Sequence, residues 1–315
     1  MIATVTLNPA LDKTMAIPGF AIGRTNRASI EQIDAGGKGI NVAKAARQLG
    51  CPVIALGFQA GANGRWAADA LRTMGVPCDF EWVPGETRVN LKIKDSLTGT
   101  ETEINEPGFQ VGADHLQLLK RKVEEQAGQC SVMVFSGSLP PGAPPEIYGE
   151  FIRIARDRGA QTVLDTAGAA LKHGIAAGPD LIKPNRAEAE EVLETSIDGE
   201  ARLVDAASRF LALGARVVVL SLGADGALAV SQRERWRAYS PAVAASSSIG
   251  AGDAMVAALA FAMMRGLKLE DALRLATAAG AATVATNGSA TELGSIEEYA
   301  KRVMLHSIGE NAGTC

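Results

Sequence analysis

Short apolar segments alternate with longer amphipathic segments along most of this chain, and this alternation restricts the possible folds more than any other feature. Strand-like segments cover residues 2–7, 53–56, 78–83, 132–135, 162–164, 181–182, 216–220, 227–230 and 236–239. Helix-like segments cover residues 38–49, 65–74, 113–126, 146–158, 201–213, 254–264, 269–285 and 296–305, and residues 307–315 have the composition of a frayed tail. Strands separated by helices at this spacing form mainly parallel sheets with helices on both faces. The sequence therefore predicts a three-layer α/β/α fold.

The composition argues against several classes of protein. The chain has 315 residues, of which 47% are apolar and 21% charged, and its net charge is −4. It contains no cluster of Lys and Arg of the kind that binds nucleic acid, so we expect a small-molecule ligand instead. The four cysteines are scattered, which favours reduced thiols over a disulfide framework or a zinc site. We expect neither a signal peptide nor a membrane span, and no linker divides residues 1–315.

The segment Gly250-Ala251-Gly252-Asp253 is the strongest candidate for a catalytic site, because it precedes the apolar run at residues 254–264. A helix that begins here presents unpaired N–H groups to an anion, such as a phosphoryl group in transfer. Asp253 stands beside those groups and could accept a proton from an attacking hydroxyl. Aspartate is also a favoured N-cap residue, so the same segment fits a purely structural role.

A second glycine-rich turn, residues 36–39, opens an amphipathic helix that ends at Gly50. It lacks both the P-loop pattern and the dinucleotide-binding glycine pattern. Lys38 and Asn41 stand beside the exposed N–H groups of this helix, where they could hold a polar or anionic ligand. A bare glycine-rich turn is also common without any ligand.

Four more polar residues occupy positions where α/β proteins often bind ligands. Asp12 follows the first strand, at the sheet edge where ligands bind in open α/β folds, although Asn8-Pro9 also marks an ordinary turn. Arg88 begins a predicted hairpin and is either an anion ligand or a solvated surface residue. Asn185 and Glu188 lie three residues apart at a helix start, where they could face one ligand or form a capping box.

Extended segments also occur outside the main alternation, within residues 13–34 and 87–106. Their polar and apolar residues alternate, which is typical of a sheet with one exposed face. We expect a small separate sheet there that serves as a lid or as a dimer surface.

Seven motifs of this chain resemble those of the PfkB family of carbohydrate kinases and occur in the family's order. They lie at residues 6–12, 36–43, 87–90, 136–140, 183–188, 221–223 and 248–253. More narrowly, the chain resembles the branch that phosphorylates sugar phosphates. The resemblance implies a ribokinase-like fold and ATP-dependent phosphorylation of a ketohexose phosphate, foremost fructose 1-phosphate. Tagatose 6-phosphate and fructose 6-phosphate are the alternative substrates.

The resemblance also implies a role for each matched residue. Asp253 would deprotonate the sugar hydroxyl, while the N–H groups of Gly250, Ala251 and Gly252 would hold the phosphoryl group. The sugar phosphate would be bound by Asp12, Gly37, Lys38, Asn41, Arg88 and Ser138. The nucleotide would be bound by Lys183, Asn185, Ser221, Gly223, Gly226 and Asn287. Mg²⁺ would be held by Glu188 and, through water, by Asn185.

The same resemblance implies ATP and Mg²⁺ as cofactors and leaves a monovalent cation, K⁺, open. It implies a cytoplasmic homodimer joined through the small sheet, without a nucleic-acid or membrane partner. A non-catalytic sensor of sugar or nucleotide is the alternative from another functional class. The presence of Asp253, Asn185 and Glu188 argues against a sensor.

Overall fold

The structure, a computed structural model, describes residues 1–243, 250–286 and 296–309. Within these residues one large sheet contains β1 (Ile2–Thr6), β4 (Val53–Ala60), β5 (Cys78–Val83), β8 (Val132–Ser136), β9 (Gln161–Asp165), β10 (Leu181–Ile182), β11 (Val217–Ser221), β12 (Ala227–Ser231), β13 (Arg235–Tyr239) and β14 (Met304–Ser307). The strand order is β14-β13-β12-β11-β10-β9-β8-β1-β4-β5. Neighbours from β11 to β5 in this order are parallel, while β12, β13 and β14 pair antiparallel.

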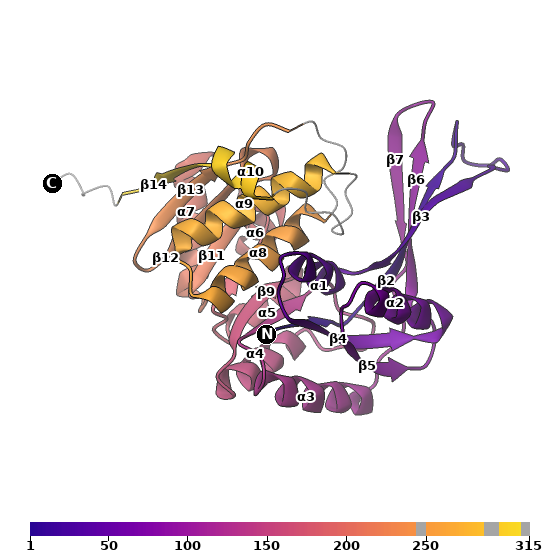
Figure 1. The fold of residues 1–315 in the computed structure, drawn as a ribbon, viewed down its shortest axis with the longest axis horizontal. Coiled ribbons are helices and arrows are strands. Elements are labelled where there is room, and N and C mark those ends of the chain that lie inside the picture. The colour runs from indigo at the N-terminus through magenta and orange to yellow at the C-terminus, as the bar shows by residue number, and fades with distance from the viewer. Residues whose placement is uncertain (244–249, 287–295, 310–315) are drawn as a thin grey trace.

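Helices cover both faces of this sheet, which confirms the predicted three-layer α/β/α fold (Figure 1). One core is built with α3 (Ala113–Ala127), α4 (Ile147–Asp157), α5 (Gly168–Ile175), α6 (Arg186–Leu193) and α7 (Gly199–Ala212). The other is built with α1 (Lys38–Gln48), α2 (Gly61–Thr73), α8 (Ala251–Arg265), α9 (Leu269–Ala285) and α10 (Ile296–Arg302). Both faces of the parallel strands are therefore apolar, as the continuous apolar strand sequences require.

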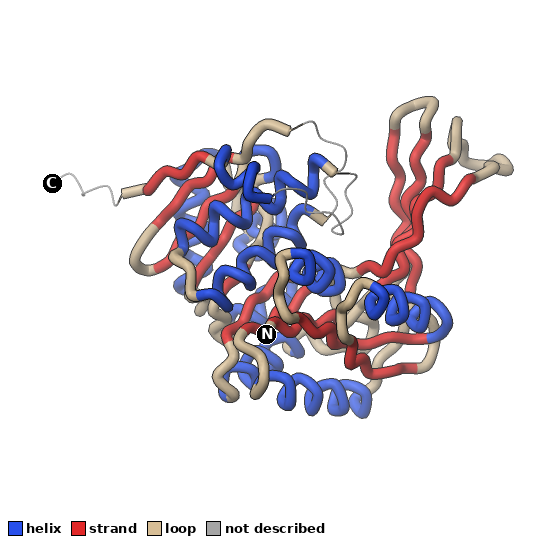
Figure 2. The backbone as a smooth tube through the Cα atoms, in the orientation of Figure 1, coloured by secondary structure: helices blue, strands red, loops and turns tan. Residues whose placement is uncertain are grey.

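A second, four-stranded sheet extends away from these layers (Figure 2). It contains β2 (Ala10–Ala16), β3 (Ser29–Gly36), β6 (Arg88–Asp95) and β7 (Thr100–Asn105), in the order β3-β2-β6-β7. The sequence predicts this sheet, but β2 begins at Ala10, directly after the turn that ends β1. The turn at Asn8 and Pro9 therefore leads directly from the large sheet into the small one.

Two segments differ from the prediction. Helix α5 was not expected, because two glycines and a length of eight residues hide its apolar pattern. The helix expected over 296–305 ends at Arg302, because Met304–Ser307 pairs with β13 instead. The expected frayed tail was wrong at its start, since Ser307 lies in β14 and Ile308 donates its N–H to the Arg235 carbonyl at 2.9 Å. Residues 310–315 lie outside the described part.

Among the described helices, none is both long and apolar enough to cross a membrane.

Candidate active site

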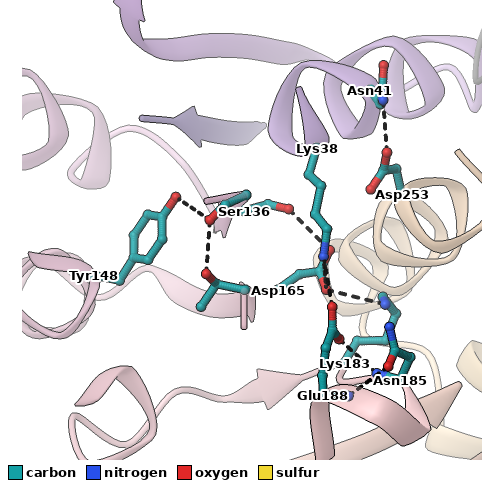
Figure 3. A network of polar contacts seen from close by, with 11 residues as sticks. Lys38, Asn41, Ser136, Tyr148, Asp165, Lys183, Asn185, Glu188 and Asp253 are labelled. Carbon is teal, nitrogen blue, oxygen red and sulfur yellow. Dashed lines mark hydrogen bonds and ion pairs between the residues drawn. The ribbon is translucent and has the colours of Figure 1, made fainter. Parts of the chain in front are cut away.

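Polar side chains gather at the carboxyl ends of the parallel strands, between the starts of α1 and α8 (Figure 3). Strand β8 ends at Ser136, β9 ends at Asp165, and Lys183 follows β10 directly. Ligands bind at this edge in open α/β sheets, because the chain leaves the sheet there in loops that lead into helices. The structure thus collects residues from four of the seven motifs at one place, together with Asp165.

Asp165 lies at the centre of this group. Its Oδ1 atom is 3.3 Å from Lys183 Nζ and 3.6 Å from Lys38 Nζ, and its Oδ2 atom accepts a hydrogen bond from Ser136 Oγ at 3.2 Å. Its side chain is only 1% exposed. Burial alone would raise the pKa of Asp165, but the two ammonium groups outweigh burial and hold this pKa below its usual value. Asp165 therefore anchors two cations in the site.

Asp165 is also the residue that sequence reasoning missed. Its position directly at the end of a buried strand is the signal that drew attention to Asp12, and the same rule applies to it. Lys38 was expected, but as a ligand of the sugar phosphate. In the structure its ammonium group contacts Asp165 and also donates to Glu188 Oε1 at 3.2 Å. These carboxylates and Asp253 raise the pKa of Lys38 against the effect of burial.

The capping-box interpretation of Asn185 and Glu188 is confirmed. The Asn185 side chain accepts the Glu188 N–H at 2.8 Å, and Glu188 Oε2 accepts the Asn185 N–H at 2.9 Å. Glu188 also uses its other carboxylate oxygen to bind Lys38. Asn185 and Glu188 thus begin helix α6 and also face the charged residues around Asp165 in Figure 3.

Asp253 is the third residue of α8 and is not the N-cap, because Gly250 occupies that position with a left-handed φ of 77°. The side chain is buried and accepts a hydrogen bond from Asn41 Nδ2 at 2.9 Å. Burial and the negative charge of Asp165 raise the pKa of Asp253 to about 6. A carboxylate with a pKa near neutrality, in the first turn of a helix, is well suited to act as a general base.

Gly252, which follows Ala251 in the first turn of α8, lies close to Lys183. A Cβ atom at position 252 would be 3.5 Å from Lys183 Nζ. The positive end of the α8 dipole and the Lys183 ammonium group therefore lie next to each other. This arrangement favours an anion at the start of α8.

A second group of polar residues surrounds Asn8 at the base of the small sheet. Arg88 donates to the carbonyl oxygen of Asn8 at 3.3 Å and to that of Glu106 at 3.1 Å. Asn8 Nδ2 reaches Ser138 Oγ at 3.4 Å and the Pro107 carbonyl oxygen at 3.1 Å. Asn8 therefore connects Arg88, which begins β6, with Ser138 after β8.

Asp12 lies in the same small sheet and packs tightly against β3. Its Oδ1 atom accepts a hydrogen bond from Asn90 Nδ2 at 2.8 Å, and burial raises its pKa. A Cβ atom on Gly36 would be 2.0 Å from Asp12 Oδ2, so any side chain at position 36 would displace the Asp12 carboxylate. Gly37, the N-cap of α1, has a φ of 108° and closes the turn beside Lys38.

The expected nucleotide residues begin at Ser221, the last residue of β11. Ser221 forms an isolated parallel bridge with Asn185. Gly223 begins a single 3₁₀ turn, and Gly226 follows that turn with a φ of 90°. Asn287, the remaining nucleotide candidate, lies outside the described residues.

The chain belongs to a known family by sequence. The family described as pfkB family carbohydrate kinase matches residues 6–295. The 1-phosphofructokinase of Rhodobacter capsulatus is 40% identical over 278 residues, which cover 88% of this chain and 88% of that protein. The 1-phosphofructokinase of Escherichia coli strain K12 is 35% identical over 283 residues, which cover 90% of each.

Three crystal structures of phosphofructokinase-2 from Escherichia coli have the same fold. The complex with potassium is 31% identical with a TM-score of 0.89, over 96% of this chain and 97% of that one. The complex with fructose-6-phosphate is 31% identical with a TM-score of 0.88, over 96% and 99%. The tetrameric inhibited form is 30% identical with a TM-score of 0.88, over 96% and 99%. With its motifs, its fold and these relatives in agreement, the chain belongs to the pfkB family of carbohydrate kinases.

Proposed function

We propose that this kinase transfers the γ-phosphoryl group of ATP to fructose 1-phosphate and forms fructose 1,6-bisphosphate. The observation that carries this proposal is the buried Asp253 carboxylate at the start of α8, held by Asn41 and flanked by the cations around Asp165. The names of the sequence relatives described above support the same substrate. Lys38 and Arg88 supply positive charge for a substrate that is already phosphorylated.

In this mechanism Asp253 removes the proton from the sugar hydroxyl as that hydroxyl attacks phosphorus. The N–H groups of Gly250, Ala251 and Gly252 stabilise the charge on the transferring group, and Lys183 beside them adds to this field. Phosphoryl transfer depends on such positioning and charge stabilisation more than on covalent chemistry.

We further propose that Asp12, Gly37, Lys38, Asn41, Arg88 and Ser138 bind the sugar phosphate. These residues lie around the start of α1 and the base of the small sheet. Lys183, Asn185, Ser221, Gly223 and Gly226 would bind ATP on the opposite side of Lys38. Lys38 thus stands between the two groups, where it can contact a phosphate from either substrate.

Mg²⁺ bound here would neutralise the ATP phosphates. The described residues contain no cluster of three or more His, Cys, Asp or Glu side chains suited to a metal. Mg²⁺ commonly takes only one or two carboxylate ligands from the protein. Glu188, with Asn185 through water, is the donor set we propose. A K⁺ requirement is a further proposal, supported by the potassium complex of phosphofructokinase-2.

We also propose that the small sheet is a lid and joins two copies of the chain. Its register places Lys13 opposite Ile33 and Leu91, and Leu91 opposite Ile104, so these side chains share one face. Ile33 is 39% exposed and Ile104 is 51% exposed. Apolar side chains exposed along one sheet face are typical of an interface.

The decisive experiment compares kcat/KM for ADP release with fructose 1-phosphate, fructose 6-phosphate, tagatose 6-phosphate and unphosphorylated fructose. We expect fructose 1-phosphate to be preferred by at least tenfold, with activity lost when EDTA removes Mg²⁺. A preference for either 6-phosphate would reassign the substrate and leave the kinase chemistry intact. Binding of ATP and sugar phosphates without turnover of any of them would favour the sensor alternative.

A further inference from the structure

Arg237, in β13, is a buried cation that no motif of this sequence explains. Its side chain is 7% exposed. The guanidinium donates to the carbonyl oxygens of Asp225 at 2.7 Å and Ala227 at 3.0 Å, and also to that of Ala238. Its Cζ atom lies 4.5 Å from the centre of the Tyr239 ring. The charge is therefore held by peptide dipoles and an aromatic face.

Burial of a charged guanidinium without a carboxylate partner costs hydration free energy. No ion pair connects Arg237 to a carboxylate of the described residues, and burial lowers the pKa of its guanidinium. A neutral side chain of similar volume would avoid the loss of hydration. What the arginine provides is a rigid fork of donors that binds several carbonyl groups at once.

Two of these carbonyl groups, of Asp225 and Ala227, flank the turn between β11 and β12. The third, of Ala238, lies in β13, the strand that contains Arg237. Asp225 ends the 3₁₀ turn that begins at Gly223, and Ala227 is the first residue after Gly226. Gly226 rests directly on β13, because a Cβ atom there would be 2.2 Å from the Ala238 carbonyl oxygen. Arg237 thus fastens the turn on both sides of Gly226.

We infer that Arg237 is a positioning residue for nucleotide binding, because it fixes the turn that carries Ser221, Gly223 and Gly226. The inference rests on the proposed function, which assigns these residues to ATP. Arg237 itself need not touch the nucleotide. Its effect is specific to one substrate, because the proposed sugar residues lie around α1 and the small sheet.

The test replaces Arg237 by methionine, which keeps an unbranched, largely apolar stem and removes the charge and the donors. We expect Arg237→Met to raise the KM for ATP by about tenfold or more, the scale of losing charged hydrogen bonds. The KM for the sugar phosphate should stay within about twofold. Arg237→Lys keeps a donor for these carbonyl groups and should recover part of the loss.

The matched control is Arg235→Met in the same strand. The Arg235 side chain makes no hydrogen bond or ion pair with the described residues, so this change should alter neither KM. Circular dichroism and sugar-phosphate binding show whether each variant is folded. If Arg237→Met does not fold, Arg237→Lys carries the test, through calorimetric titration with a non-hydrolysable ATP analogue.

Equal changes in both KM values, or an unchanged KM for ATP, would overturn the inference. If Arg237→Met is unfolded and Arg237→Lys binds the ATP analogue with unchanged affinity, Arg237 serves folding alone. That result would also overturn the inference. Failure of the proposed function would look different, because the wild-type protein itself would then show no kinase activity.

Discussion

Asp253 shows how position within a helix decides what an aspartate does. At the N-cap it would accept a backbone N–H and keep a low pKa. Three residues further on, the chain buries it beside Asn41 and near the negative charge of Asp165, and its pKa rises. The difference between a cap and a candidate base is therefore less than one helical turn.

Replacement of Asp253 by asparagine tests this role directly. Asp253→Asn should lower kcat by at least about 10²-fold, the usual contribution of general-base catalysis. ATP and sugar-phosphate dissociation constants should change little, because shape and burial are kept. Asp271→Asn, an exposed residue in the first turn of α9, is the matched control. A kcat near the wild-type value would remove Asp253 from the mechanism.

The raised pKa of Asp253 predicts a specific pH profile. A general base must be ionised, so kcat should fall as the pH decreases through about 6. An aspartate with its ordinary pKa near ~3.9 would keep kcat constant to much lower pH. Measurement of kcat at saturating substrates from pH 4.5 to 9 locates the acid limb. A midpoint below about pH 5 would contradict the assignment.

Most residues of the site could be predicted from the sequence because they sit in short motifs with local signals. Glycine-rich turns before helices mark Lys38 and Asp253, and the spacing of Asn185 and Glu188 marks a helix start. Asp165 has no such motif. Its place at the end of β9 is a local signal, but its cationic neighbours depend on strand order, which puts β9 between β8 and β10 and cannot be read from local sequence.

At the scale of elements, strands and helices with strong apolar periodicity were predicted well. The exceptions are α5 and β14, which depend on tertiary contacts. Helix α5 is short and contains two glycines, and β14 exists because β13 offers it an unpaired edge. Their formation is decided by neighbours distant in sequence, which local propensity does not describe.

The junction of β2 and β3 gives a prediction at this scale. Gly36→Ala should push Asp12 out of place, because the new Cβ atom would overlap its carboxylate. We expect the KM for the sugar phosphate to rise by about tenfold, roughly 1.4 kcal/mol, while the KM for ATP is unchanged. Gly128→Ala, where a Cβ atom meets only an ordinary contact, is the control. An unaltered sugar KM would show that Asp12 does not bind the sugar.

At the scale of the whole molecule, the small sheet is the part that the three-layer fold does not explain. It projects from the layers (Figure 1). Ile33 and Ile104, which share one of its faces, are exposed. Ile33 and Ile104 belong to neither of the two cores. Association of two copies is the simplest way to bury them.

Sedimentation velocity tests this association. We expect the wild-type protein to be a dimer at micromolar concentration and Ile104→Lys to be a monomer, because a charge in an apolar interface is costly. Leu213→Lys changes a residue with nearly the same exposure, 50% against 51%, at the end of α7 and should leave the dimer intact. A monomeric wild-type protein would rule out the proposed assembly.

Keeping Asp253 ionised within the core also limits how heat-resistant the molecule can be. Because its folded pKa is raised, its stabilising contribution is complete below pH 3.8 and is lost as the pH rises through about 6. A shift of about two units corresponds to roughly 3 kcal/mol, at about 1.4 kcal/mol per unit. Laboratory selection for thermal tolerance at pH 8 would therefore favour neutral residues at position 253 and would yield sturdier but inert proteins.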